Sequence, residues 1–338
     1  MTTDPKQVAV LGAGSWGTAL AKSLSDAGHS VRLWARREDQ ASRIQSSREN
    51  ADYLPKIMLG DTLRATHSLQ EALSGVDMVV SVIPTHGLRE TLDQAAPFFP
   101  ADAPILSATK GIEIGTLKLV SGIFEDHFPS DRHHLLAYLG GPSFAKEVAL
   151  GMPTAVVVAG HDGTTSERVQ SILGTERLRV YTTDDVVGIE LGGALKNVIA
   201  IAAGCGDGLG FGHNTRAAIV TRGLAEIGRL AMALGAHPMT MAGLGGIGDL
   251  MLTCTGDLSR NRRVGLELGA GKTLEEILAG MNQVAEGVKT TKSAHELSKK
   301  HAVEMPIVDA MHRILYEGLA PREAVGDLMG RRVRRERD

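Results

Sequence analysis

The chain has 338 residues, which is enough for one or two domains, and we expect two. Its hydrophobic fraction of 43% is sufficient for well-buried cores, while the formal net charge of -3 gives no sign of a nucleic-acid partner. Only two cysteines are present, Cys205 and Cys254, so neither a disulfide framework nor a cysteine-rich metal cluster is expected.

The sequence contains no pattern typical of a membrane protein. No apolar run reaches the roughly 18 residues that span a bilayer, and the polar start, Met1 to Lys6, lacks the apolar region of a signal peptide. We therefore expect a soluble cytoplasmic protein without membrane insertion. The basic ending, Arg331 to Asp338, is short, and we interpret it as a solvated tail.

The first predicted element is an apolar strand at Val8 to Leu11, followed directly by a G-x-G-x-x-G run. In such a turn Gly12 permits the sharp bend, Gly14 lets the backbone approach a pyrophosphate, and Gly17 lets the next helix pack against the strand. A helical pattern follows, and then a second strand at Val31 to Trp34. This order predicts a dinucleotide site with the phosphates at the helix N-terminus.

The end of the second strand indicates which dinucleotide is bound. An acidic residue at this place would bind a ribose 2'-hydroxyl, whereas this chain has Arg36 and Arg37. Two guanidinium groups favour a 2'-phosphate, so we expect NADPH to be preferred, with NADH possible. The alternative is that both arginines are solvated and neutralised by Glu38 and Asp39.

Strand-like runs alternate with helical patterns through the first half of the chain. The later strands are predicted at Met78 to Ile83, Pro104 to Ala108, Leu135 to Leu139 and Thr154 to Ala159. This rhythm predicts an α/β fold with a Rossmann-type, doubly wound, mostly parallel sheet. Ligands of such sheets lie beyond the carboxyl ends of the strands, which draws attention to Lys110, Gly141 and Ser143. His86 follows a strand too, and we interpret it as a loop residue.

Past about Asp184 the pattern changes to long helical stretches with no convincing strand. We therefore predict a dinucleotide-binding domain over residues 1–184 and an all-α substrate-binding domain over residues 185–338. Leu178 to Tyr181 has the pattern of a last strand of the first domain.

One lysine lies inside a segment that is apolar on nearly all sides, at residues 188–203. Burial lowers the pKa of a lysine, which suits Lys196 to proton transfer, and Gly192 and Gly193 leave space beside it for a ligand. The alternative is that Lys196 reaches past its neighbours to water. Asp249 is expected to pair with Lys196, to cap the helix that follows it, or both.

A phosphate site is predicted where Ser259 opens a helix whose first turn contains Arg260, Arg262 and Arg263. Arginine at a helix N-terminus opposes the macrodipole, but it can bind an anion together with the backbone N–H groups. The alternative is an exposed basic patch. Two glycine-rich segments, 204–212 and 243–249, indicate close backbone approach, either to a ligand or between helices. No spacing resembles a metal site, so metal-free hydride transfer is expected.

Taken together, these motifs make nearly the whole chain resemble the bacterial NAD(P)-dependent glycerol-3-phosphate dehydrogenases. The resemblance lies in Gly12 to Ala19, Ser107 to Glu113, Gly141 to Glu147, Ala194 to Val198, Gly246 to Leu250, Ser259 to Arg262 and Val284 to Gly287. It implies reversible reduction of dihydroxyacetone phosphate to sn-glycerol 3-phosphate, a precursor of phospholipids. Hydride would come from the nicotinamide, with Lys196 as proton donor and acceptor.

The resemblance also implies the other site residues. Lys110 would add positive charge near the reacting oxygen, and Asp249 would orient Lys196. The residues expected at the substrate are Lys110, Gly141, Ser143, Lys196, Asp249, Ser259, Arg260 and Asn261. The residues expected at the cofactor, besides Gly12, Gly14 and Gly17, are Ser15, Trp16, Arg36, Arg37, Tyr53, Lys110, Ala145, Arg260, Val284 and Glu286.

Other readings of the sequence remain open at this point. A 6-phosphogluconate or 3-hydroxyisobutyrate dehydrogenase also pairs a dinucleotide domain with a helical one and uses a lysine. The predicted phosphate site and the length of the resemblance argue against both. A non-catalytic NADPH-sensing regulator would need no buried lysine at the cofactor cleft. We expect a homodimer, because the helical half presents several alanine- and leucine-rich faces.

Overall fold

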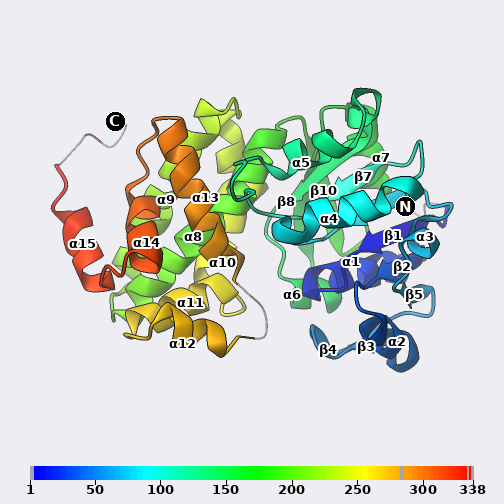
Figure 1. Cartoon of the computed structure of the whole chain (residues 1–338), viewed down its shortest axis with the longest axis horizontal. Helices are drawn as coiled ribbons and strands as arrows, with labels where there is room; N and C mark the ends of the chain where they lie inside the picture. The colour runs from blue at the N-terminus through cyan, green and yellow to red at the C-terminus, as the bar shows by residue number, and fades with distance from the viewer. Residues whose placement is uncertain (1–3, 282–284, 333–334, 336–338) are drawn as a thin grey trace.

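The computed structural model describes residues 4–281, 285–332 and 335. An α/β half and a helical half lie side by side (Figure 1). The predicted fold class is confirmed, because the first half contains an eight-stranded, mostly parallel sheet in the order β10-β9-β8-β7-β6-β1-β2-β5. Its strands are β1 (Gln7–Leu11), β2 (Ser30–Trp34), β5 (Leu63–Thr66), β6 (Met78–Ser81), β7 (Ile105–Ser107), β8 (Leu136–Gly140), β9 (Thr154–Ala159) and β10 (Leu178–Thr183).

The sheet is parallel except between β8 and β9, which pair antiparallel. Its central strands are buried on both faces, since every residue from Val8 to Leu11 in β1 and from Met78 to Ser81 in β6 is buried. Continuous apolar runs of this kind are typical of a sheet covered by helices on both sides. The strand pattern noted at Leu178 is a real strand, β10, which pairs parallel with β9.

Three strands between Trp34 and Met78 were not predicted. β5 pairs with β2 at one edge of the sheet, and β3 (Glu49–Asn50) with β4 (Leu54–Met58) forms a separate two-stranded sheet. All three lack the continuous apolar run by which the longer strands are recognised: β3 has two polar residues, β5 alternates apolar and polar residues over four positions, and β4 is interrupted by Pro55 and Lys56. Their pairing depends on neighbours elsewhere in the chain.

The helices surround the sheet in the first half and form the whole of the second half. The first group is α1 (Ser15–Asp26), α2 (Glu38–Ser47), α3 (Leu69–Leu73), α4 (Thr85–Ala95), α5 (Val120–His127), α6 (Ala145–Ala149) and α7 (Gly163–Leu173). The second is α8 (Val186–Gly208), α9 (His213–Ala233), α10 (Asp249–Thr255), α11 (Arg260–Gly269), α12 (Leu274–Ala279), α13 (Glu286–Lys300), α14 (Pro306–Tyr316) and α15 (Pro321–Met329).

Helix α8 is the core of the second half (Figure 1). By length and composition it could cross a membrane, but 94% of its most apolar stretch is buried inside the protein. Glycines bring it against α11, since a Cβ atom at Gly204 would lie 2.0 Å from the Arg262 carbonyl oxygen, and one at Gly265 would lie 1.9 Å from that of Ile201. The first glycine-rich segment therefore serves helix packing at Gly204.

Candidate active site

The glycine turn after β1 has the geometry that its three glycines predict. Gly12 has a φ of +115°, and a Cβ atom there would lie 2.8 Å from the Val82 carbonyl oxygen. A Cβ atom at Gly17 would lie 1.9 Å from the Gly12 carbonyl oxygen, so any side chain would push α1 off the strand. Gly14 faces open space and precedes α1 without a side-chain cap, which leaves the first N–H groups of α1 available to an anion.

Four predicted cofactor residues gather around this turn. The Ser15 hydroxyl donates a hydrogen bond to the Tyr53 carbonyl oxygen at 2.6 Å, which ties the loop between β3 and β4 to the start of α1. Trp16 and Ala145 are partly buried against one small core, whose members are Ala19, Leu54, Ile57 and Ala149. Helix α6, which begins at Ala145, therefore packs beside the glycine turn.

The two arginines after β2 differ in their surroundings. The Arg37 guanidinium lies 3.8 Å from the Asp39 carboxylate and 3.6 Å from that of Asp52, with about half of its side chain exposed. Arg36 is exposed and forms no ion pair with any residue in the described part of the chain. The pKa of His86 is lowered by burial and by the charges of Lys289 and Arg36, so Arg36 belongs to a positively charged neighbourhood.

Hydrogen bonds join the loops that follow β6 and β7. The Thr109 hydroxyl donates to the Ile83 carbonyl oxygen at 2.7 Å, and the Thr85 hydroxyl donates to the Lys110 carbonyl oxygen at 3.1 Å. A Cβ atom at Gly111 would lie 2.7 Å from the Thr85 hydroxyl oxygen. These contacts hold Lys110 at the carboxyl edge of the sheet, where ligands of such sheets bind.

The two predicted site lysines meet one carboxylate. Lys110 Nζ lies 2.9 Å from Asp249 Oδ2, and Lys196 Nζ forms a short ion pair with Asp249 Oδ1. The Asp249 side chain is 1% exposed, that of Lys196 is 9% exposed and that of Lys110 is 17% exposed. The expected pairing of Asp249 with Lys196 is therefore present, and Lys196 does not reach past its neighbours to water.

The three charges shift one another's pKa values. Burial and the Lys110 charge lower the pKa of Lys196 to about 8, although Asp249 acts in the opposite direction. Burial also disfavours the charged form of Lys110, but Asp249 outweighs it and the pKa of Lys110 is raised. For Asp249 the two ammonium groups outweigh burial, so its pKa is lowered. Lys196 is therefore the member of the trio whose pKa is moved toward neutral pH.

On the predicted substrate side, Gly141 follows β8 with a φ of +109°, and a Cβ atom there would lie 3.1 Å from Val156 Cα. The Ser143 hydroxyl donates to the Gly141 carbonyl oxygen at 3.2 Å. The Ser259 hydroxyl caps α11 by accepting a hydrogen bond from the Arg262 backbone N–H at 3.2 Å, as its position predicts.

The expectation of three phosphate-binding arginines in α11 needs correction. The Arg262 guanidinium lies 2.8 Å from Asp207 and 3.1 Å from Asp257, and that of Arg263 lies 3.6 Å from Glu267. Both side chains are thus paired with carboxylates: Asp207 comes from the C-terminal end of α8, against which α11 packs, whereas Glu267 lies one turn further along α11 itself. Arg260 is exposed, and its charge acts on Glu286 together with the charges of Lys110 and Lys196, which is why it stays a candidate for the substrate phosphate.

Asn261 belongs to a buried hydrogen-bond chain that connects three helices. Its side-chain amide donates to Asn197 Oδ1 at 2.9 Å, and its Oδ1 accepts from the Gly287 backbone N–H at 3.0 Å. Burial raises the pKa of the partly buried Glu286, although the charges of Arg260, Lys110 and Lys196 act in the opposite direction. Val284 lies outside the described residues.

The contact of Asn261 with Asn197 was missed at the sequence level, although one signal pointed to it. Asn197 follows Lys196 in a helix that is otherwise apolar, and a buried amide requires a partner. Its partner lies 64 residues away in the sequence, so nothing local identifies Asn261 as that partner.

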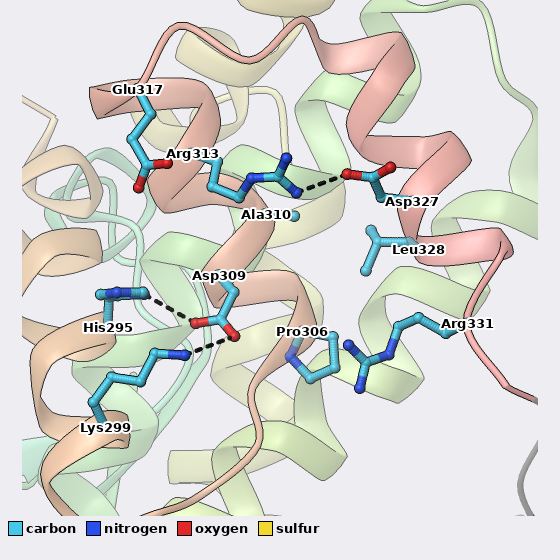
Figure 2. A pocket seen from close by; sticks show the side chains of 10 residues that line it. All are labelled: His295, Lys299, Pro306, Asp309, Ala310, Arg313, Glu317, Asp327, Leu328 and Arg331. Atoms are coloured by element: carbon cyan, nitrogen blue, oxygen red, sulfur yellow. Dashed lines mark hydrogen bonds and ion pairs between the residues drawn. The ribbon is translucent and has the colours of Figure 1, made fainter.

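A second concave surface lies between α13, α14 and α15, and none of the predicted site residues lines it. Figure 2 shows that its charged side chains face one another: His295 lies 2.9 Å from Asp309, Lys299 lies 3.4 Å from Asp309, and Arg313 lies 2.7 Å from Asp327. Because these charges neutralise one another, we interpret the groove as a structural contact between helices.

Comparison with known families gives two matches that together span most of the chain. Residues 7–166 match a family described as NAD-dependent glycerol-3-phosphate dehydrogenase N-terminus. Residues 185–326 match its counterpart, NAD-dependent glycerol-3-phosphate dehydrogenase C-terminus. The two matched segments correspond to the α/β half and the helical half.

Individual relatives cover the chain nearly end to end. A glycerol-3-phosphate dehydrogenase [NAD(P)+] of Citrifermentans bemidjiense is 54% identical over 331 residues, covering 98% of this chain and 99% of the relative. The enzyme of the same name from Myxococcus xanthus is 53% identical over 327 residues, covering 97% of this chain and 98% of the relative. The crystal structure of glycerol-3-phosphate dehydrogenase from Coxiella burnetii superposes with a TM-score of 0.91 at 41% identity, covering 97% of this chain and 99% of that one.

Proposed function

Because the chain belongs to the NAD-dependent glycerol-3-phosphate dehydrogenase family, we propose that it reduces dihydroxyacetone phosphate reversibly to sn-glycerol 3-phosphate with NAD(P)H. The observation that carries the proposal is the pair of ammonium groups, Lys110 and Lys196, on either side of the buried Asp249. Two positive charges and one negative charge leave an excess of positive charge where a ketone oxygen would gain negative charge.

The glycine turn supports binding of the dinucleotide. The uncapped N–H groups at the start of α1 suit the pyrophosphate, and the open face of Gly14 gives room for it. Ser15, Trp16, Tyr53 and Ala145 lie around the same turn. When bound, the nicotinamide supplies the hydride for the carbonyl carbon.

We assign the proton transfer to Lys196. As an ammonium group it gives a proton from Nζ to the substrate oxygen while the carbon gains the hydride, and in the reverse reaction neutral Lys196 accepts that proton. A pKa of about 8 allows both forms near neutral pH. Lys110, whose pKa is raised, stays charged and stabilises the developing alkoxide. Asp249 holds both nitrogens in place.

The substrate phosphate is assigned to the start of α11, where Ser259, Arg260 and Asn261 lie. We expect dihydroxyacetone, which lacks the phosphate, to be reduced with at least a hundredfold lower kcat/KM than dihydroxyacetone phosphate, because charge-assisted contacts are lost. Loss of NADPH absorbance with each compound measures this. Arg260→Ala should shrink the ratio between the two, whereas Arg263→Ala, at the ion pair with Glu267, should leave it unchanged. Equal rates for the two compounds contradict the assignment.

The NADPH preference is assigned to Arg36. Arg36→Asp places a carboxylate where the 2'-phosphate would lie, so the ratio of kcat/KM values for NADPH over NADH should fall by at least tenfold. Arg37→Ala is the matched control and should change the ratio less, since Asp39 and Asp52 already neutralise Arg37. If the NADPH-to-NADH ratio of kcat/KM values is unchanged in Arg36→Asp, another group distinguishes the 2'-phosphate from the 2'-hydroxyl.

Four further assignments complete the proposal. We place the domain boundary between residues 184 and 185, just before α8; the C-terminal family match begins at residue 185, and the N-terminal match ends at residue 166. The product is a glycerophospholipid precursor, so we assign the enzyme to lipid synthesis in the cytoplasm. For the assembly we propose a homodimer, which light scattering tests directly.

A further inference from the structure

Helix α5 is capped by a residue of the other half of the protein. Its own N-cap residue, Leu119, has no polar side chain and makes no capping bond. Instead the carboxylate of Glu190 in α8 accepts hydrogen bonds from the Ser121 backbone N–H at 2.8 Å and from the Ser121 hydroxyl at 2.5 Å. Glu190 is 8% exposed, and burial raises its pKa to about 7, with Glu125 acting in the same direction.

The segment that ends at α5 contains Lys110. It leaves the sheet after β7 and closes on itself, because Ile112 and Leu119 form a β-bridge and the Glu113 N–H donates to the Lys118 carbonyl oxygen at 2.9 Å. We call residues 108–119 the Lys110 loop. The base of this loop is therefore attached to the start of α5, at the place where Glu190 holds Ser121.

Helix α8 touches the Lys110 loop a second time. A Cβ atom at Gly193 would lie 3.5 Å from Lys110 Cδ, so the lysine stem runs against the surface of α8. Glu190 and Lys196 lie on this same helix, less than two turns apart, and an α-helix is rigid over such a length. Helix α8 thus contains Lys196 and, through Glu190, also binds Ser121 at the base of the loop that contains Lys110.

We propose that Glu190 is a positioning residue: through Ser121 it holds the Lys110 loop against α8 and so sets the distance between the Lys110 and Lys196 ammonium groups. This inference rests on the proposed function, in which Lys196 is the proton donor. The Lys110 charge is one cause of the lowered pKa of Lys196. When the hydrogen bonds between Ser121 and Glu190 are lost, Lys110 moves away from Lys196 and the pKa of Lys196 rises.

The test compares Glu190→Ala, Glu190→Gln and Ser121→Ala with a matched pair at Glu226. Glu226 is also a buried glutamate with a pKa raised to about 7 by burial, and it also caps a helix of another element, accepting from the Ile307 N–H at 2.8 Å. It lies in α9, and its hydrogen bonds go to the start of α14 and not to the Lys110 loop. For each variant, kcat/KM for dihydroxyacetone phosphate is measured from pH 6 to pH 10, together with NADPH affinity and Tm.

In Glu190→Ala we expect kcat/KM at pH 7 to fall about tenfold, with NADPH affinity retained. The pH limb, by which we mean the fall of kcat/KM as pH rises through about 8, should move upward by about half a pH unit. Glu190→Gln, whose amide oxygen still accepts from the Ser121 N–H, should restore most of both. Ser121→Ala should give a smaller shift in the same direction. Glu226→Ala and Glu226→Gln should lower Tm without moving the limb.

Two outcomes overturn the inference. One is a limb that stays in place in both Glu190→Ala and Ser121→Ala; the other is an equal movement in the Glu226 variants. If Glu190→Ala does not fold, the test rests on Ser121→Ala and Glu190→Gln. An unchanged pH dependence of kcat/KM in Ser121→Ala then overturns the inference. Lys196→Arg, measured in parallel, separates this inference from the proposed function: a limb near 8 that survives in Lys196→Arg removes Lys196 as the proton donor, whatever Glu190 does.

Discussion

Replacing Lys196 by alanine is expected to lower kcat/KM for dihydroxyacetone phosphate by about 10³-fold, because the proton donor is removed while the hydride geometry remains. NADPH affinity should stay within about twofold of the parent value, since the pyrophosphate is assigned to the glycine turn and Lys196 belongs to α8. Stopped assays at saturating NADPH measure kcat/KM for dihydroxyacetone phosphate, and fluorescence titration measures the NADPH affinity.

The pH dependence makes the Lys196 prediction specific. Reduction needs the ammonium form, so its rate should fall as pH rises through about 8, whereas oxidation of sn-glycerol 3-phosphate needs the neutral amine and should rise through the same value. Lys196→Arg keeps the charge but cannot release a proton in this range, so it should be as inactive as Lys196→Ala. Lys272→Ala, at an exposed ion pair with Glu267, is the control and should behave as the parent enzyme. Near-normal turnover in Lys196→Ala contradicts the mechanism.

Asp249→Asn is expected to damage both stability and activity. The substitution leaves two ammonium groups at a buried site without a counter-charge, which costs about 3 kcal/mol of folding free energy. The pKa of Lys196 should then fall further, because burial and Lys110 act without opposition from Asp249. The limb in the reduction rate should therefore move to lower pH, and turnover at pH 7 should fall by about 10²-fold.

The matched control for Asp249→Asn is Asp207→Asn. Asp207 is a nearly buried aspartate that bridges Arg216 and Arg262, at 2.7 Å and 2.8 Å. Its loss should also lower the free energy of unfolding, measured by urea denaturation, but the pH limb should stay near 8. If the reduction rate falls at the same pH in the parent enzyme and in Asp249→Asn, Asp249 does not govern the protonation of Lys196.

The elements with strong local signals could be predicted from the sequence. The glycine turn was recognisable because its G-x-G-x-x-G run stands between an apolar strand pattern and a helical one, and Gly12 and Gly17 indeed lie where a side chain would meet backbone atoms. Helix α8 was recognisable because its apolar residues cover all faces, and Lys196 stood out for the same reason. The short strands β3, β4 and β5 were missed because each is defined by its pairing and not by its composition.

The site could be predicted only in part, for a related reason. Three arginines in the first turn of α11 looked equivalent, yet Arg262 and Arg263 are occupied by carboxylates. Likewise Arg36 and Arg37 are adjacent in the sequence, but Asp52 comes close to Arg37 through the loop between β3 and β4. Asp207, which pairs with Arg262, and Asp52, which pairs with Arg37, are supplied by other elements, so composition alone could not tell how these arginines are paired.

What the sequence by itself determined is the order of the elements, the dinucleotide turn and the presence of a lysine in a buried helix. The pairing of Lys196 with Asp249 was expected from the sequence, but only the tertiary structure showed that Lys110 binds the other oxygen of the same carboxylate and that Glu190 accepts hydrogen bonds at the base of the Lys110 loop. Lys110 lies 139 residues and Lys196 lies 53 residues from Asp249 along the chain. A local apolar pattern records that a face is buried but not what it is buried against, because that partner is chosen when distant elements pack.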